Sequence, residues 1–250
     1  MTFENRIEKL NKFIQESTNI VFFGGAGVST ESGIPDFRSK DGLYNTIDVK
    51  FEKYSPEYLL SHSCLKNNPE VFFEFYRQKL NCENIEPNIT HKVLAALEVR
   101  GYLKSIITQN IDGLHQKAGS KNVWEIHGTT QDCYCLKCGK HYAGSYIFIN
   151  KEPLPHCECG GIVRPNVVLY EESLPSFAYN EAYTDLIYAD LIIVGGTSLT
   201  VYPASNFILE AMNWGKARIV IINRDITSID ERCDLVFHES LGEVFSRIEY

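Results

Sequence analysis

The chain has 250 residues, a length that suits one large domain or one domain with a modest insertion. Its 24 Lys and Arg residues stand against 32 Asp and Glu residues, and the net charge of −8 argues against nucleic-acid binding and against binding to an anionic membrane surface. Hydrophobic residues at 44% and charged residues at 22% are typical of a globular protein and exclude wholesale disorder. No apolar run approaches the roughly 20 residues of a membrane span, and residues 1–6 lack a basic segment followed by an apolar block. We therefore expect a soluble, cytoplasmic protein.

Strand and helix patterns alternate along most of the chain. Residues 2–16 carry Ile7, Leu10 and Ile14 at helical spacing behind Thr2 as N-cap, and predict a helix. Four apolar runs that end in glycine or polar residues predict buried parallel strands over residues 20–23, 103–108, 191–194 and 217–222. Residues 90–100 and 203–213 predict helices between them. This order predicts an α/β fold with a Rossmann-type doubly wound parallel sheet.

Two stretches interrupt the alternation and predict a smaller second domain. Residues 55–80, with Ser55 as N-cap and Pro56 in the first turn, predict helices rich in aromatic side chains, while residues 129–165 contain most of the cysteines. We expect a large domain over about residues 1–40, 90–128 and 166–250. The small domain would come from insertions at about residues 41–89, which are helical, and residues 129–165.

Five of the eight cysteines lie within residues 133–159, which favours a metal site over disulfides in a reducing compartment. The pair Cys135 and Cys138, and after 18 residues the pair Cys157 and Cys159, nearly match a four-cysteine zinc ribbon. The second pair has one intervening residue where two are usual, so either Cys157 or His156 is the third ligand, and Cys133 competes as a spare thiol. We favour Cys157. Four protein ligands leave no open position for water, which predicts a structural zinc.

The glycine turn after the first strand, Gly25-Ala26-Gly27-Val-Ser29-Thr30, opens like a dinucleotide-binding fingerprint. However, Thr30 replaces the third glycine, and no acidic residue closes a second strand about 20 residues on, which disfavours a nicotinamide dehydrogenase. Asp36, Phe37 and Arg38 follow within a short stretch. They favour a ligand-gripping loop over a plain surface loop, and Arg38 is suited to a phosphate.

A second glycine turn, Gly195-Gly196-Thr197-Ser198, ends another predicted strand, and Asn223 follows the next. Each turn alone could equally be a simple connection between a strand and a helix. Because the carboxyl ends of parallel strands meet at one edge, the two turns together predict one nucleotide site built from both halves of the chain.

Two further strand exits are polar, residues 108–115 and residues 124–128. A single histidine is more often structural, but His127 ends an apparent strand beside the other exits and is followed by a glycine. Its ordinary pKa of about 6.5 suits a general base at neutral pH. We therefore predict that His127 is catalytic and that His115 orients a neighbour or packs.

Together these residues resemble one family, the sirtuins, which are NAD-dependent protein lysine deacylases, and most closely its bacterial members. The resemblance covers nearly the whole chain and identifies residues 1–250 as a single catalytic region. The motifs that carry it, in order, are residues 25–29, 33–38, 108–115, 127–128, the cysteine pairs, 164–170, 196–198 and Asn223.

The resemblance implies that NAD and an acyl-lysine meet in a cleft between the two domains, and that NAD is consumed as a co-substrate. His127 would deprotonate a ribose hydroxyl, and the acyl group would pass from lysine to ADP-ribose with release of nicotinamide. Asn110 and Asp112 would be catalytic with His127. The implied NAD site comprises Gly25, Ala26, Gly27, Ser29, Thr30, Asp36, Phe37, Arg38, Gln109, Asn110, Ile111, Asp112, His127, Gly196, Thr197, Ser198, Asn223 and Leu241.

The same resemblance implies partners that are acyl-lysine proteins, bound as an extended strand along Val168, Leu169 and Tyr170. Tyr76 and Lys79 match the positions of a tyrosine and an arginine that grip acidic acyl groups in some members. Lysine cannot grip a carboxylate with two parallel bonds, so we expect a preference for acetyl and short aliphatic groups. Glu171 stands where the family usually has glycine, and it adds charge at the substrate groove.

Two other functions fit parts of this pattern. An NAD-consuming ADP-ribosyltransferase on the same fold would need neither a base at His127 nor an acyl-lysine edge. A non-catalytic sensor of NAD or ADP-ribose, with the zinc ribbon as a docking surface, would not need the set of His127, Asn110 and Asp112. The presence of these features favours the deacylase.

Overall fold

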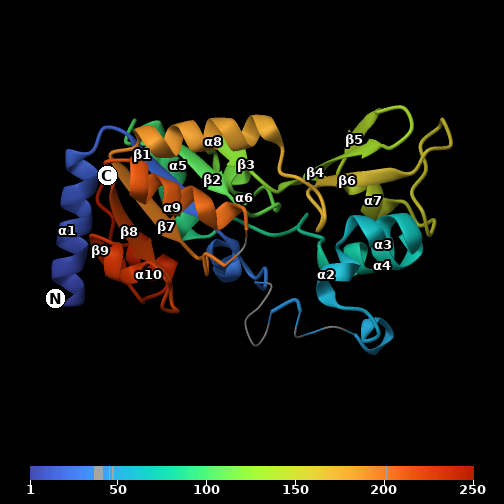
Figure 1. Ribbon diagram of the computed structural model, residues 1–250, viewed down its shortest axis with the longest axis horizontal. Helices are drawn as coiled ribbons and strands as arrows, with labels where there is room; N and C mark the ends of the chain where they lie inside the picture. Colours follow the sequence, from blue (N-terminus) through green and yellow to red (C-terminus); the bar gives the residue numbers. More distant parts are fainter. Residues whose placement is uncertain (37–41, 45, 47, 201) are drawn as a thin grey trace.

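The computed structural model describes residues 1–36, 42–44, 46, 48–200 and 202–250. Two sheets dominate this part of the chain, a parallel sheet of six strands and an antiparallel sheet of three (Figure 1). The parallel sheet and its helices form one end of an elongated molecule, and the antiparallel sheet with its own helices forms the other. Within the described ranges, no helix combines the length and apolar character that crossing a lipid bilayer requires.

The six-stranded sheet has the order β3-β2-β1-β7-β8-β9, and every neighbouring pair is parallel. The order reverses between β1 and β7, as in doubly wound nucleotide-binding sheets. The predicted fold class is therefore confirmed. The strands are β1 (Ile20–Gly24), β2 (Leu103–Thr108), β3 (Val123–Glu125), β7 (Leu191–Gly195), β8 (Arg218–Ile222) and β9 (Leu235–Phe237).

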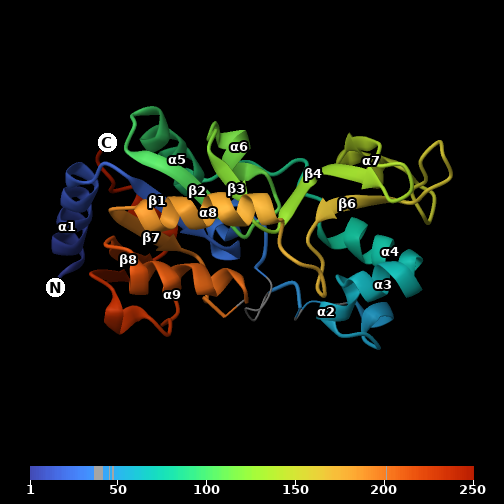
Figure 2. The ribbon, with the colours of Figure 1, turned by 45° about the horizontal axis from the view of Figure 1, so that its top comes forward.

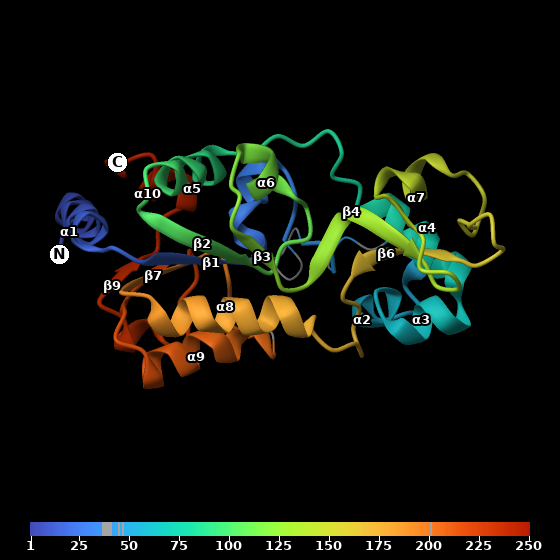
Figure 3. The same cartoon turned by 90° about the horizontal axis from the view of Figure 1, so that it is seen from above.

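Helices cover both faces of this sheet (Figure 3). Strand side chains alternate between the faces, so Phe22 packs into the core under α1 and α5 while Phe23 packs into the core under α8 and α9. This alternation explains why the central strands are apolar without interruption. The helices of the first face are α1 (Phe3–Glu16), α5 (Ile89–Val99), α6 (Leu114–Ala118) and α10 (Leu241–Phe245), and those of the second are α8 (Ser176–Tyr188) and α9 (Ala204–Trp214).

Helix ends follow the capping residues in the sequence. The Thr2 hydroxyl accepts the Asn5 N–H at 3.3 Å and starts α1. Asn88 starts α5, because its side-chain oxygen accepts the Thr90 N–H at 3.0 Å. Gly101, at φ +81°, takes the left-handed conformation that ends this helix.

Within the described part of the chain, the other end of the molecule contains a short antiparallel sheet and four helices (Figures 1 and 2). The short sheet has the order β5-β4-β6, and both pairings are antiparallel. Aromatic residues such as Phe72 and Phe75 pack with Cys133 and Val163 into one core shared by the helices and the sheet. The elements are α2 (Pro56–Leu59), α3 (His62–Asn67), α4 (Pro69–Lys79), β4 (Gly128–Cys135), β5 (His141–Ala143), α7 (Ser145–Ile149) and β6 (Val163–Val167).

Short 3-10 turns complete the framework: η1 (Ala26–Val28), η2 (Thr30–Ser32), η3 (Val49–Phe51) and η4 (Asp230–Arg232). The first two follow β1 directly and form the glycine turn. The domain boundaries given above remain a prediction.

Two histidines are buried against each other between α5 and α6. The rings of His91 and His115 lie 4.7 Å apart and are 0% and 1% exposed. Burial lowers the pKa of His91 to about 4, and burial together with the nearby His91 lowers the pKa of His115 well below its usual range. Both rings are therefore neutral in the folded protein at neutral pH.

These histidines predict a loss of stability in mild acid. Below about pH 6.5 these histidines bind protons in the unfolded chain but not in the folded protein, where the rings are buried. The free energy of unfolding is therefore highest above this pH and falls as the pH drops. Each histidine should cost about 2 kcal/mol between pH 7 and pH 5. Urea unfolding of a His91→Phe variant should show a smaller loss than the wild type over this interval. Equal slopes for the two proteins would contradict the assignment.

Candidate active site

Two glycine turns that lie far apart in the sequence meet at the carboxyl ends of β1 and β7. Gly25 N–H donates to Gly195 O at 3.1 Å, and Gly27 N–H donates to Gly196 O at 2.9 Å. A Cβ atom on Gly27 would lie 2.7 Å from Gly196 Cα, and Gly196 itself has φ +60°. Only glycine permits this approach. The turns form one floor at the point where the strand order reverses, which is where open sheets bind ligands.

Behind this floor, Ser29 connects the first turn to the exit of β2. The Ser29 hydroxyl donates to Asp112 Oδ2 at 2.6 Å and accepts from Asn110 Nδ2 at 3.0 Å. Leu114 N–H donates to the other carboxylate oxygen at 2.9 Å. Burial raises the pKa of Asp112, and the two hydrogen bonds to its carboxylate oppose that rise. All three polar side chains are thus held rigidly at the edge of the sheet.

Gln109 connects the two halves of the site to His127. Its side-chain nitrogen donates to Thr197 Oγ1 at 3.0 Å, and its carbonyl oxygen lies 3.0 Å from His127 Nδ1. A carbonyl only accepts, so the imidazole carries its hydrogen on Nδ1 and keeps the lone pair on Nε2. Burial lowers the pKa of His127, and the bond to Gln109 opposes this. The ring is therefore a neutral base at neutral pH.

Three more predicted residues lie in the first turn or at the exit of β2. Ala26 begins η1, and the Thr30 hydroxyl donates to Gly27 O at 3.0 Å, which closes the turn. Ile111 O accepts both the N–H and the hydroxyl of Thr130, each at 2.8 Å, which fixes the segment between Asn110 and Asp112.

Predicted residues of the second half follow the ends of β7 and β8 and begin α10. The Ser198 hydroxyl lies 2.8 Å from Thr200 Oγ1, and Asn223 Nδ2 donates to Asp225 O at 2.8 Å. Leu241 is buried at the start of α10, close enough that a Cβ on Gly195 would lie 2.8 Å from it.

The loop after the first turn is described only at its ends. Asp36 O accepts the Leu43 N–H at 2.8 Å, whereas Phe37 and Arg38 lie outside the described residues. The expected contacts of this phenyl ring and this guanidinium remain predictions.

The predicted substrate edge joins the histidine to the helical insertion. Val168 N–H donates to His127 O at 2.8 Å, so the edge starts at the backbone of the proposed base. Two residues on, Tyr170 N–H donates to Leu60 O at 3.0 Å and Tyr170 O accepts the His62 N–H at 3.1 Å. The segment is therefore held from both sides.

Tyr76 and Lys79 do not meet in the structure. The Tyr76 side chain is 0% exposed, stacks on Phe72, and its hydroxyl has no hydrogen-bond partner among the described residues. Lys79 Nζ instead donates to Thr46 O at 2.9 Å on the surface. The intervening Arg77 points the other way and donates to the carbonyls of the loop after α7.

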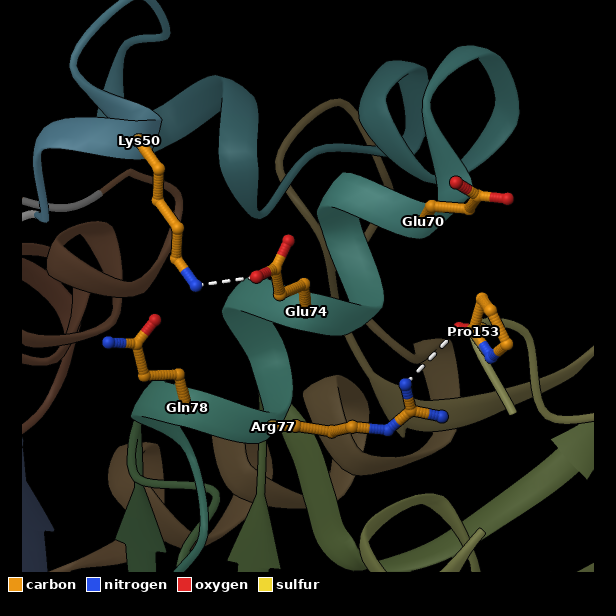
Figure 4. Close-up of a pocket in the computed structure, with 6 residues that line it drawn as sticks. All are labelled: Lys50, Glu70, Glu74, Arg77, Gln78 and Pro153. Carbon is orange, nitrogen blue, oxygen red and sulfur yellow. Dashed lines mark hydrogen bonds and ion pairs between the residues drawn. The ribbon is translucent and has the colours of Figure 1, made fainter. Parts of the chain in front are cut away.

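Figure 4 shows this outer face of α4. A cavity of about 480 Å³ opens there, and Arg77 lies along its wall with a bond to Pro153 O at 3.2 Å. An ion pair between Lys50 and Glu74 lies within it. Arg77 is bonded to backbone carbonyls and not to a carboxylate of the cavity, and the face is separate from Tyr76 in the core.

The four predicted metal ligands come together. The sulfur atoms of Cys135, Cys138, Cys157 and Cys159 all lie within 4.8 Å of one another, and two of the distances are 3.5 and 3.6 Å. Four thiolates about 2.3 Å from a tetrahedral zinc ion would be separated by about 3.8 Å, so the cluster fits zinc.

The two other candidate ligands lie outside the cluster. Cys133 Sγ donates to Tyr142 O and Ala143 O at 3.5 and 3.2 Å, and its thiol is satisfied without a metal. His156 is not among the clustered ligand atoms of the described residues, and its backbone pairs with Ile162. The geometry therefore favours Cys157 as the third ligand.

An ion pair that local sequence patterns do not identify stabilises the predicted substrate edge. The Arg164 side chain, 5% exposed, donates to both oxygens of Glu172 at 2.5 and 3.0 Å. Burial raises the pKa of Glu172, but the hydrogen bonds from Arg164, Leu169 N–H and His62 outweigh it and lower the pKa to about 2. A strand residue that carries a charge between apolar neighbours is the signal that could have identified this pair.

This combination of a doubly wound sheet, paired glycine turns and a neutral histidine is typical of enzymes that act on a nucleotide. Comparison with known proteins identifies the family. A model described as the Sir2 family matches residues 25–203. The chain belongs to the Sir2 family, and the predicted resemblance is confirmed.

Close relatives come from bacteria. A protein of Clostridium tetani is 51% identical over 243 residues, which cover 96% of each chain. One of Clostridium acetobutylicum is 48% identical over 245 residues, 98% of each chain. Both are named NAD-dependent protein deacetylase, which is the activity that the sequence predicts.

Solved structures agree over most of the chain. A structure described as Sir2 bound to acetylated peptide has a TM-score of 0.86 and 35% identity, covering 96% of each chain. Another, of Sir2 with a p53 peptide and NAD+, has a TM-score of 0.85 at the same identity and coverage.

The cysteine cluster predicts that metal loss destabilises the fold. In a Cys159→Ser variant the remaining ligands should no longer hold zinc, and metal analysis should find much less than one ion per chain. Because binding energy at such a site is folding energy, several kcal/mol should be lost, roughly 10 °C in Tm. Cys233→Ser, outside the cluster, should retain both the metal and the Tm. A metal-free Cys159→Ser protein with the wild-type Tm would contradict a structural role.

Proposed function

We propose that this chain is an NAD-dependent protein lysine deacetylase in which His127 is the general base. The observation that carries the proposal is the imidazole itself, neutral, with Nδ1–H donated to Gln109 O and with Nε2 left to accept a proton. It lies at the edge of the sheet where the glycine turns, Asn110 and Asp112 converge.

The residues present fit NAD. The glycine turns let the backbones of both halves of the site meet with no side chain between them, and Ser29, Asn110 and Asp112 place polar groups beside this floor. When bound, NAD would supply the ADP-ribose that accepts the acyl group. The glycine turns with Thr197, Ser198, Asn223 and Leu241 would hold the nucleotide.

His127 would accept a proton at Nε2, and Gln109 would keep the ring oriented for this through Nδ1. The Val168 N–H bond to His127 O places the substrate edge beside the base, so an acyl-lysine protein bound there as an extended strand would present its side chain close to the ring. Thiolate ligands for zinc require reduced cysteines, which supports a cytoplasmic location. We also propose the domain division expected from the sequence, with the active site between the large and the small domain.

A single assay tests this function. Incubation with NAD and an acetyl-lysine peptide should yield free lysine, nicotinamide and acetylated ADP-ribose. ADP-ribosylated protein without free lysine would identify a transferase, and NAD binding without turnover would identify a sensor. Either outcome would overturn the proposal.

His127→Ala should lower kcat by about 100- to 10,000-fold, because a positioned base is lost. NAD binding, measured by calorimetry, should stay within a few fold of the wild type, since the glycine floor is unchanged. A matched His141→Ala variant, which removes an exposed histidine on β5, should retain full activity. Near-normal turnover by His127→Ala would show that another group is the base.

Acidic acyl groups should be poor substrates. The Tyr76 hydroxyl is enclosed in the core and Lys79 is engaged by Thr46 O, so a buried acyl carboxylate would lose its water without compensation. We expect kcat/KM for succinyl-lysine to be at least about tenfold below that for acetyl-lysine on one peptide. Lys79→Ala should leave this ratio unchanged. A kcat/KM for succinyl-lysine as high as that for acetyl-lysine would contradict this expectation.

A further inference from the structure

The substrate edge has almost no free N–H groups. All three N–H groups of residues 168–170 already donate, to His127 O, to the Glu172 carboxylate and to Leu60 O, at 2.8, 3.0 and 3.0 Å. A peptide strand cannot pair with groups that are already bonded. An N–H group that donates to the bound peptide must therefore belong to a residue other than these three.

Two carbonyl groups of the edge are also occupied. Leu169 O accepts the Glu172 N–H at 3.0 Å, and Tyr170 O accepts the His62 N–H at 3.1 Å. Within the described residues, the N–H and C=O of Glu171 have no hydrogen-bond partner, and neither does the C=O of Val168. The backbone of an added strand would thus hydrogen-bond to Val168 and Glu171 but not to Leu169 and Tyr170.

Glu171 is held in an unusual conformation at this point. Its φ is +75°, in the left-handed region that glycine adopts readily and other residues seldom do. Its carboxylate accepts the Ser63 N–H at 2.8 Å, at the start of α3. This bond ties the side chain to the helical insertion and keeps the carboxylate beside the free backbone groups.

The charge of Glu171 is not neutralised. The adjacent Glu172 pairs with Arg164 and His62, whereas none of the ion pairs among the described residues includes Glu171. The Glu171 side chain is exposed. A single uncompensated carboxylate therefore lies where a bound peptide would pass.

We propose that Glu171 makes this enzyme prefer acyl-lysine peptides that carry a lysine or arginine close to the modified residue. The inference rests on the proposed function. Side chains on adjacent strands lie about 5 Å apart, which places a residue of the peptide in reach of the Glu171 carboxylate.

The position of that residue is limited by the length of the edge. The acyl-lysine must reach His127, which is bonded to Val168, and Glu171 follows Val168 by three residues. At about 3.3 Å per residue in a strand, the basic residue should lie within three positions of the acyl-lysine.

The test uses seven-residue acetyl-lysine peptides, neutral except for one Lys or one Glu at each flanking position in turn. Both kcat/KM and Kd, the latter from fluorescence anisotropy, are measured for the wild type and for Glu171→Gln. Glutamine keeps an oxygen for the Ser63 N–H but removes the charge. Glu8→Gln, an exposed residue on α1 at the far end of the molecule, makes the same change of net charge as a control.

At one or more positions the wild type should favour Lys over Glu, and Glu171→Gln should reduce this ratio by about two- to fivefold at low salt, as expected for one exposed charge pair. The effect should shrink at about 0.5 M salt because exposed charges are screened. Glu8→Gln should match the wild type. Glu171→Gly, which also relieves the left-handed strain, should fold and show the same loss of preference.

An unchanged ratio in Glu171→Gln, or normal turnover with no preference at any position, would overturn the inference and leave the deacetylase intact. A preference in Kd without turnover would support Glu171 and overturn the proposed function instead. The two failures are therefore distinguishable.

Discussion

The close approach of the two glycine turns is the constraint on which the rest of the site depends. Gly25 and Gly27 donate to carbonyls of Gly195 and Gly196, and no side chain fits between them. This contact sets how far β1 and β7 extend together before the chain turns away. Since Gln109 N–H bonds to Gly24 O, the exit of β2 is fixed relative to the same floor, and with it the carbonyl that orients His127. The proposed nucleotide site and the proposed base are thus connected through backbone groups, and the side chains of Gln109 and Ser29 complete the connection.

A partly buried ion pair between Arg164 and Glu172 holds the proposed substrate edge. Removing Arg164 and Glu172 from water is costly, and their attraction compensates only when every remaining donor and acceptor is satisfied. Here the guanidinium also donates to Val167 O, while the carboxylate also accepts the Leu169 N–H. The pair therefore specifies one conformation of residues 167–172. Its contribution is to the geometry of the edge more than to overall stability.

Much of this arrangement could be predicted from residues that act locally. The apolar runs identify the central strands, the glycine turns identify the proposed nucleotide edge, and Thr2 and Ser55 identify helix starts. Local patterns do not predict which residues far apart in the sequence come into contact. The contact of Gly27 with Gly196 depends on two strands meeting in one register, and the separation of Tyr76 from Lys79 depends on which side of α4 the shared core covers. Helix α8 was not predicted at all, because it buries only Ala182 and Leu186 and so has little helical periodicity.

The metal cluster and the substrate edge are coupled through the same core. Cys135 and Val163 face each other across β4 and β6, and both pack against the aromatic side of α4. Strand β6 then runs directly from Val163 through Arg164 to Val167, so the zinc module sets the position of the strand that leads into the edge. Arg77 adds a second tie, because it donates to Ile147 O, Glu152 O and Pro153 O and holds the loop of the cysteine module against α4. Loss of the four-cysteine cluster would therefore also disturb residues 167–172, because β6 links the cluster to the proposed substrate edge.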